Sequence, residues 1–543
     1  MIPETETPSS SPDSSDHFRN YVESILDVLD RDAGRDILTG PDGRKTTAGE
    51  FRDSVHRMAA ELSDRGIGRG STVSLLSGNM PEALSARYAV NLLGARVAFL
   101  HEVIHTQIAP DVVAHLVQSI DTAILLVDPA LQSVAADLLT RPGLPPMLFL
   151  GPSPLGEDLL ACSARHTGRR PANAARPGDD WCLRMTGGST GIPKSVCVPF
   201  ERHLKVLTDR AARLRARPPH PGDTDATPRF LACASIAHSA GSTADATLLA
   251  GGRVVLQRGF APGEVFAAIE RERITDVWLL SPMLGQLLKH PDAGTTDVSS
   301  LHRVSYGGHL LSPDRLRRAA EVLGPVLHGW YGQTEVGLIS EVLPHEHTLI
   351  GRMGQITAGR AIPGVEITVC DATGERLPAG KVGEIRVRSP QVMSGYWKQP
   401  EISSELLCDG WLRTGDAGYL DEAGYLYICG RYKEVIKLAG SHQVFPAELE
   451  SLLVTHPAVE QCMVFGVRRP DDAEEIHAVI VPAPGHTVDH DQIRDFVTAH
   501  KGNIYAPGML HLLTDLPLNA VGKPDKKQVQ TMLGLAGASV TVY

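Results

Sequence analysis

Over most of its first 340 residues the chain alternates short, β-branched apolar runs with amphipathic stretches. The runs at 71–78, 95–100 and 122–128 have the length and composition of buried strands, and 81–93 has the periodicity of a helix. This alternation is typical of βαβ units, in which helices cover a parallel sheet. A chain of 543 residues is too long for one hydrophobic core, so several domains are expected.

The pattern repeats once and then changes. A loop-rich bridge at 164–180 precedes a strand at 181–185, and a second alternating region runs to about residue 340. Beyond it the chain becomes all-β, with short strands separated by Gly/Pro turns at 365–371, 383–389 and 424–430. The last hundred or so residues mix helices with strands, at 446–456, 461–467, 476–483 and 491–500. This last segment indicates a compact α+β unit.

Composition excludes some classes of function. Lys and Arg number 52 against 63 Asp and Glu, a net charge of −11, which argues against nonspecific attraction to nucleic acid or anionic membrane. No stretch approaches the roughly 18 apolar residues of a membrane span. Residues 1–17 are polar, the reverse of a signal peptide, and are expected to be a disordered lead-in. The eight cysteines are scattered without metal-ligand spacing and predict reduced thiols in a cytoplasmic protein.

A glycine-rich loop is the first candidate site. Residues 186–195 read TGGSTGIPKS and follow the strand at 181–185. Glycines let backbone N–H groups approach anionic oxygens, hydroxyls add donors, and Lys194 adds a charge. The pattern is not a Walker loop, because Pro193 stands where GxxxxGK requires glycine. The loop predicts phosphate contacts from Thr186, Gly187, Gly188, Ser189, Thr190, Gly191 and Lys194.

Four further motifs follow in order: YGQTE at 331–335, TGD at 414–416, RYK at 431–433 and PLNAVGK at 517–523. Together with the loop, they resemble the acyl-adenylate-forming superfamily of acyl-CoA synthetases, luciferases and peptide-synthetase adenylation domains. The loop departs from the family form, close to TSGTTGxPKG, at Gly187, Ser189 and Ser195, which are all small or hydroxyl residues. The resemblance covers about 181–527 and is weakest before residue 70.

The resemblance implies a role for each matching residue. Tyr331, Gly332 and Gln333 would border the adenosine, with Tyr331 near adenine, while Thr334 would contact the α-phosphate and Glu335 would hold Mg²⁺. Asp416 and Arg431 would bind the ribose, and Lys433 would be the interdomain hinge. Lys523 would bridge the acid's carboxylate and the α-phosphate and offset charge in the transition state. The implied catalytic set is Lys194, Thr334, Glu335 and Lys523.

The predicted fold class is α/β and α+β. A large N-terminal domain at 18–432 would hold two αβαβα-type subdomains and a small β-barrel or distorted sheet. A smaller, mobile α+β domain at 433–543 would close over it, and its rotation would let one site run two reactions.

A further group of residues bears on the acid pocket. Residues 235–241 resemble the motif that lines it, with His238 at the position that contacts the acid. No carboxylate lies between Cys233 and Gly241 to pair with an ammonium group, so an α-amino acid is disfavoured and an aryl or fatty acid is expected. Further wall residues would be Tyr306, Gly307, Gly308 and His309.

The prediction of the acceptor depends only on where one segment lies in the chain. Residues 437–441 stand where the family's pantetheine channel lies, with Ala439-Gly440 in place of a Gly-Gly pair. We expect ATP, Mg²⁺ and coenzyme A as cofactors and a thiol as the acceptor. A carrier protein, a nitrogen nucleophile, an unusual oxyanion such as nitrite, and a nucleotide-binding pseudoenzyme are the alternatives.

One motif is discounted. His101 to His105 fit the zinc-protease pattern HExxH, but the segment follows a strand and precedes a helix start at Pro110. On an extended chain the two histidines would lie about 13 Å apart. One Zn²⁺ with bonds of about 2.1 Å could not reach both. His345 and His347 are interpreted as ordinary loop histidines.

Overall fold

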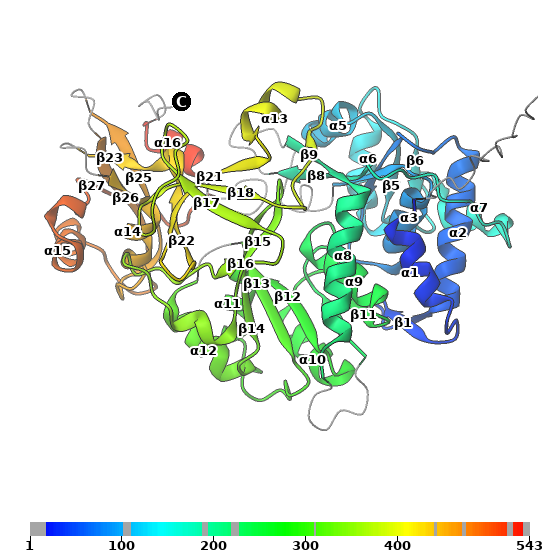
Figure 1. The fold of residues 1–543 in the computed structure, drawn as a ribbon, viewed down its shortest axis with the longest axis horizontal. Helices are drawn as coiled ribbons and strands as arrows, with labels where there is room; N and C mark the ends of the chain where they lie inside the picture. Colours follow the sequence, from blue (N-terminus) through cyan, green and yellow to red (C-terminus); the bar gives the residue numbers. More distant parts are fainter. Residues whose placement is uncertain are drawn as a thin grey trace, which may run out of the picture.

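The computed structural model describes residues 18–100, 110–186, 194–218, 227–308, 311–438, 443–469, 474–517 and 525–535. The predicted lead-in at 1–17 and the HExxH segment lie outside these residues. The described chain forms two large sheets, an antiparallel sheet and a C-terminal α+β unit, as the sequence predicts. Figure 1 shows them side by side, with the C-terminal elements at the end opposite the first helices.

The first large sheet has eight strands in the order β19-β9-β8-β4-β3-β5-β6-β7. Strands β3 to β8 are parallel, whereas β9 and β19 add an antiparallel edge. The bounds are β3 (Thr72–Leu76), β4 (Arg96–Phe99), β5 (Thr122–Val127), β6 (Met147–Phe149), β7 (Glu157–Asp158), β8 (Asp180–Thr186), β9 (Lys194–Pro199) and β19 (Gly395–Tyr396). Its helices are α2 (Ala48–Asp64), α3 (Pro81–Leu92), α5 (Pro110–Ser119), α6 (Gln132–Leu139) and α7 (Leu159–Ser163).

The second large sheet has nine strands in the order β16-β15-β14-β13-β12-β10-β11-β1-β2. The strands are β1 (Asp36–Thr39), β2 (Lys45–Thr47), β10 (Arg229–Ala232), β11 (Arg253–Leu256), β12 (Asp276–Leu280), β13 (Arg303–Gly307), β14 (Leu327–Gln333), β15 (Gly337–Val342) and β16 (Arg360–Ala361). Helices α10 (Pro262–Glu272), α11 (Ser281–Lys289) and α12 (Pro313–Leu323) cover one face. Strands β1 and β2 come from the first alternating region but pair here, so the two regions are not separate sheets.

Three helices lie between the two large sheets: α1 (Tyr21–Leu29), α8 (Phe200–Arg215) and α9 (Ser239–Leu249). Helix α8 packs on β8 and β9, and α9 packs on β10, β11 and β12 (Figure 1). One apolar cluster joins these helices to both sheets. It contains a buried ion pair between Arg87 of α3 and Asp245 of α9, whose side chains are 1% and 0% exposed.

The all-β segment forms a five-stranded antiparallel sheet. Its strands are β17 (Glu366–Cys370), β18 (Gly383–Arg388), β20 (Leu407–Cys408), β21 (Trp411–Leu420) and β22 (Leu426–Arg431), with α13 (Pro400–Leu406) alongside. Within the described residues β17 pairs with β18 alone, so the sheet stays open where a small barrel was one expectation. Tyr419 of β21 and Tyr427 of β22 stack with ring centres 5.0 Å apart and pack with Ala417, Cys429 and Phe445.

The described elements that follow β22 form an α+β unit. Its strands are β23 (Ile436–Lys437), β24 (Gln443–Val444), β25 (Val459–Arg468), β26 (Glu474–Pro482) and β27 (Met509–Leu512). Its helices are α14 (Pro446–Leu453), α15 (His490–Lys501) and α16 (Lys526–Met532), so both predicted helices and both predicted strands are present. The boundary at residues 432 and 433 stays a prediction.

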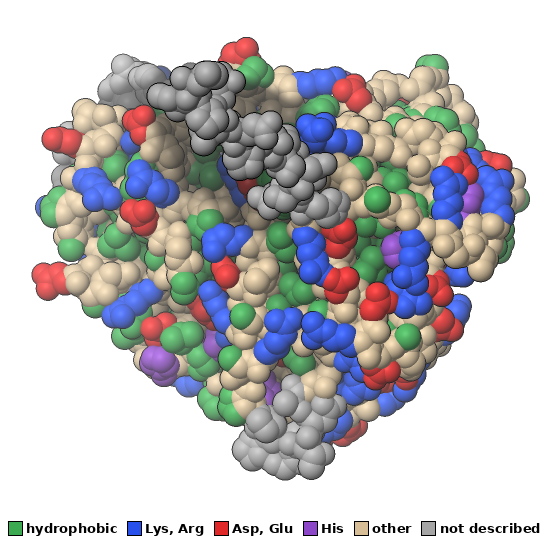
Figure 2. Space-filling model, turned by 45° about the vertical axis from the view of Figure 1, so that its right-hand side comes forward, with side chains coloured by type: hydrophobic (Ala, Val, Ile, Leu, Met, Phe, Trp, Pro, Cys, Tyr) green, Lys and Arg blue, Asp and Glu red, His purple; other side chains and the backbone are tan. Residues whose placement is uncertain are grey.

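On the face of the molecule shown in Figure 2, Lys/Arg and Asp/Glu side chains are interspersed. In the described part of the chain, no helix has the length and apolar character needed to cross a membrane. All eight cysteines are free thiols.

Candidate active site

The predicted phosphate loop connects β8 to β9. Thr186 ends β8, Lys194 begins β9, and the two pair in register at the base of the hairpin. Residues Gly187, Gly188, Ser189, Thr190 and Gly191 lie outside the described residues. The structure therefore places the two ends of the loop, and the phosphate contacts stay a prediction.

Three of the predicted residues contact Asp416. Its Oδ2 accepts hydrogen bonds from the Tyr331 hydroxyl at 2.6 Å and from Gln333 Nε2 at 2.7 Å. Arg431 Nη1 lies 3.2 Å from Oδ1. Tyr331 and Gln333 come from β14, Asp416 from β21 and Arg431 from β22, so three strands of two sheets meet here. Burial, and then the Asp416 charge, raises the pKa of Tyr331, which keeps that hydroxyl a donor.

The local backbone explains why Asp416 stands at this point. Gly415 has φ +69°, the left-handed conformation that glycine adopts most readily. Asp416 N–H donates to Thr414 Oγ1 at 3.0 Å, and that hydroxyl donates to the Ile385 carbonyl at 2.7 Å. These bonds fix the direction of the Asp416 carboxylate before any ligand binds.

Glu335 and Lys194 meet at a residue that the sequence motifs do not include. The hydroxyl of Tyr396 donates to Glu335 Oε1 at 2.8 Å, and Lys194 Nζ lies 5.0 Å from the centre of the same ring. Tyr396 is on β19, which pairs with β9 beside Lys194. Tyr396 therefore joins the loop strand to the YGQTE motif. The sequence analysis assigned no role to this segment, which reads SGYW at 394–397.

The predicted acid motif at 235–241 is positioned by a residue that follows a strand of the first large sheet. His238 is the N-terminal flanking residue of α9. Asn79, buried after β3, donates from Nδ2 to the carbonyls of Ala232 and Ala234 at 3.1 and 2.9 Å. Its Oδ1 accepts from Ile236 N–H at 2.9 Å. A single amide thus fixes the path of the β10–α9 connection that presents His238.

Strand β13 directs its predicted wall residues to opposite faces. Gly307 is in register with Trp330, on the face toward α8 and α9. Tyr306 faces α10 to α12, and its hydroxyl is 2.9 Å from His347 Nε2. Because His347 Nδ1 is 3.0 Å from the Pro344 carbonyl, it is the donor there and Nε2 accepts from Tyr306. His347 is therefore not an ordinary loop histidine.

The other predicted residues are more dispersed. Gly308 follows Gly307 with φ +94°, Gly332 lies in the β14–β15 hairpin, and Thr334 is half-buried beside it. Lys433 is exposed on a short turn after β22. His309, Lys523 and the channel residues Ala439 and Gly440 lie outside the described residues, so their roles stay predictions.

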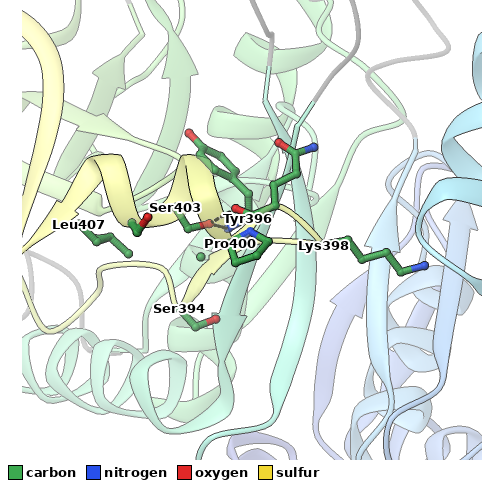
Figure 3. A pocket seen from close by; sticks show the side chains of 9 residues that line it. Ser394, Tyr396, Lys398, Pro400, Ser403 and Leu407 are labelled. Atoms are coloured by element: carbon green, nitrogen blue, oxygen red, sulfur yellow. Dashed lines mark hydrogen bonds between the residues drawn. The ribbon is translucent and has the colours of Figure 1, made fainter.

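An open depression of about 430 Å³ lies between β19 and α13. Figure 3 shows its lining, where Ser403 Oγ accepts from the Tyr396 N–H at 2.8 Å. Tyr396 is the lining residue that also contacts Glu335. None of the residues predicted to bind nucleotide or acid lines it, so the chemistry is not assigned to this depression.

The family model of AMP-binding enzymes matches residues 27–397, and that of the AMP-binding enzyme C-terminal domain matches 448–523. The chain belongs to the AMP-binding enzyme family. It is accordingly an ATP-dependent, AMP-forming ligase of the acyl-adenylate-forming superfamily.

The chain aligns with members of this family along nearly its whole length. The chain is 31% identical to the medium/long-chain-fatty-acid–CoA ligase FadD8 of Mycobacterium tuberculosis, over 93% of this chain and 89% of that protein. It is 30% identical to a feruloyl-CoA synthase of an Amycolatopsis species, over 91% and 95%. The solved structure of the amide bond synthetase McbA from Marinactinospora thermotolerans is 34% identical with TM-score 0.83, over 94% and 99%.

Proposed function

We propose that this family member joins an aryl or fatty carboxylic acid to AMP and passes the acyl group to the thiol of coenzyme A. The observation that carries the proposal is the convergence of separate motifs. Asp416 accepts hydrogen bonds from Tyr331 and Gln333 and forms an ion pair with Arg431, and Glu335 and Lys194 both contact Tyr396.

The Asp416 group is suited to a nucleoside. A carboxylate fixed by its own backbone can accept from both ribose hydroxyls, and charge-assisted bonds of this kind are stronger than neutral ones. Arg431 lies against Asp416 and supplies donors to the same sugar. The Tyr331 hydroxyl is bound to Asp416, which fixes its ring beside the nucleoside position.

The Glu335 group is suited to the triphosphate. Glu335 is half-buried and uses Oε1 to accept from Tyr396. Mg²⁺ takes one or two protein carboxylates and fills its other positions with water and phosphate oxygens, so Glu335 fits a Mg²⁺ ligand. When bound, Mg²⁺ would neutralise charge on the phosphates. Lys194 and Thr186 would orient the phosphates from the loop, and Thr334 would contact the α-phosphate.

The first reaction forms acyl-AMP. The carboxylate oxygen attacks the α-phosphorus, the bond to the bridging oxygen breaks, and pyrophosphate leaves. Lys523 would neutralise charge that accumulates between the acid and the α-phosphate. In the second reaction the thiolate attacks the acyl carbon and AMP leaves, so positioning and charge stabilisation are the protein's main contributions.

A thiol acceptor is supported by the relatives. Several of them are coenzyme A ligases, and the alignments cover nearly their full length. A second candidate is an amine. It is favoured by one observation, the 34% identity and TM-score of 0.83 to the amide bond synthetase McbA.

One experiment separates the two acceptors. Pyrophosphate release is measured across fatty and aryl acids, and products are identified by mass spectrometry with coenzyme A alone, with a primary amine alone, and with neither. A thioester that forms faster than any amide supports the proposal. An amide that forms without coenzyme A, with no thioester in its presence, overturns the thiol acceptor and establishes the amine.

A further inference from the structure

The two carboxylate oxygens of Glu335 are not equivalent. Oε1 accepts a hydrogen bond of 2.8 Å from the Tyr396 hydroxyl. Within the described chain, no other residue donates a hydrogen bond to this carboxylate. A hydrogen bond draws electron density from the oxygen that accepts it, so Oε2 is left as the stronger metal ligand. The carboxylate that the proposed function assigns to Mg²⁺ therefore offers one free oxygen.

The donor of this hydrogen bond is itself held in place. Tyr396 is 8% exposed, and its backbone N–H donates to Ser403 Oγ at 2.8 Å (Figure 3). Lys194 Nζ lies 5.0 Å from the centre of its ring. Burial, and then the Glu335 charge, raises the pKa of Tyr396, so the hydroxyl stays protonated and remains a donor. The bond to Oε1 is therefore formed before any ligand arrives.

The backbone fixes the same pair of residues. Tyr396 lies on β19, which pairs antiparallel with β9. Three residues earlier, the Met393 N–H donates to the Glu335 carbonyl at 2.7 Å. Glu335 is thus bonded to the segment 393–396 through its main chain and through its side chain. Because both bonds end on one segment of a sheet, the carboxylate has little freedom to turn its bonded oxygen toward a metal.

Two common divalent cations respond differently to such a carboxylate. Mg²⁺ is octahedral and keeps several of its waters, so one carboxylate oxygen is enough for it. Ca²⁺ is larger, takes more oxygen ligands and is often bound by both oxygens of one carboxylate. A glutamate that offers one oxygen therefore favours Mg²⁺ over Ca²⁺.

We propose that Tyr396 sets the metal selectivity of the site by restricting Glu335 to one ligating oxygen. This rests on the proposed function, in which Glu335 is a ligand of the metal that accompanies ATP. Tyr396 is a positioning residue, because it acts through Glu335.

The test measures binding of the nucleotide with each metal. The probe is an ATP analogue with a methylene group between the α- and β-phosphorus, which cannot be cleaved there. Isothermal titration calorimetry gives its Kd with saturating Mg²⁺ and, separately, with saturating Ca²⁺. The wild-type chain is expected to bind the Mg²⁺ complex more tightly. Tyr396→Phe keeps the ring beside Lys194 and frees Oε1, so it should lower the ratio of Mg²⁺ to Ca²⁺ affinity by about tenfold or more.

A matched tyrosine–glutamate pair supplies the control. The Tyr425 hydroxyl donates to Glu346 Oε1 at 2.9 Å, and neither residue is among those predicted to bind nucleotide or acid. Tyr425→Phe removes the same kind of hydrogen bond and should keep the wild-type ratio. Glu335→Gln should weaken both complexes, because it removes the charged ligand that both metals would use.

The outcomes separate the inference from the proposed function. A wild-type ratio in Tyr396→Phe, with an unchanged circular dichroism spectrum, overturns the inference and leaves the ligase intact. An equal loss of affinity for both complexes also overturns it, since the hydroxyl would then support the nucleotide site without selecting a metal. Equal affinity of the wild type for the two complexes overturns it without any variant. A wild-type chain that binds neither complex overturns the proposed function as well.

Discussion

The buried ion pair between α3 and α9 gives the sharpest prediction about stability. Arg87 Nη2 donates to Asp245 Oδ1, with side-chain exposures of 1% and 0%. The same oxygen accepts from the Tyr88 hydroxyl at 2.6 Å, and His203 Nε2 lies 3.4 Å from Oδ2. Arg87→Met would leave Asp245 as a buried carboxylate without its cation.

The expected loss can be bounded from these contacts. Removing one partner of a buried pair costs about 3–5 kcal/mol. Because Tyr88 and His203 remain beside Asp245, we expect the lower end, about 3 kcal/mol. Urea unfolding followed by tryptophan fluorescence measures it, since Trp181 stacks on His203 with ring centres 3.9 Å apart. Neutralising both partners in Arg87→Met/Asp245→Asn should recover the wild-type value to within about 1 kcal/mol.

A matched exposed pair supplies the control. Arg169 and Asp64 are 2.7 Å apart with exposures of 46% and 39%, so Arg169→Met should cost about 0–1 kcal/mol. A loss below 1 kcal/mol in Arg87→Met would refute the reasoning. So would a double variant as unstable as the single one, because the loss would then come from packing and not from the unpaired charge.

Three other predictions follow from the site and the core. Burial lowers the pKa of His203 to about 4, so between about pH 6.5 and 4 the unfolded chain binds a proton that the folded chain does not; stability should fall as the pH falls through this window, and His203→Gln should flatten the fall. Asp416→Asn removes the charge that accepts from Tyr331 and should raise the KM for ATP about tenfold or more, with an unchanged circular dichroism spectrum as the check on folding. Tyr396→Phe releases Glu335 and should weaken the apparent Mg²⁺ affinity in pyrophosphate release by about 10–100-fold, whereas an unchanged Mg²⁺ titration would remove Tyr396 from the site.

The sequence predicted the elements better than their partners. Apolar runs at 71–78 and 122–128 became β3 and β5, because strand periodicity is local. The pairing of β1 with β11 was not predictable, since Leu38 is in register with Val254, 216 positions further along the chain, and no local pattern encodes that contact. An open sheet formed from the all-β segment for the same reason, because closure depends on pairing between distant strands.

The sequence motifs predicted residues that would bind nucleotide and acid, whereas the residues that connect and position them were identified only in the structure. Asp416 and Tyr331 were expected to serve one nucleoside, and the fold joins them by a hydrogen bond. Asn79 and Tyr396 act through contacts with segments far along the chain, so no motif spacing marks them.

The central claim is that the chain cleaves ATP between the α- and β-phosphates in the service of an acid. The most direct measurement is ³¹P NMR of the reaction with and without an acid panel, in the wild type and in Lys523→Ala. AMP and pyrophosphate are expected in equal amounts, only when an acid is present, with this activity lost in Lys523→Ala although the variant folds. ADP and phosphate as products, or equal activity in the variant, would contradict it.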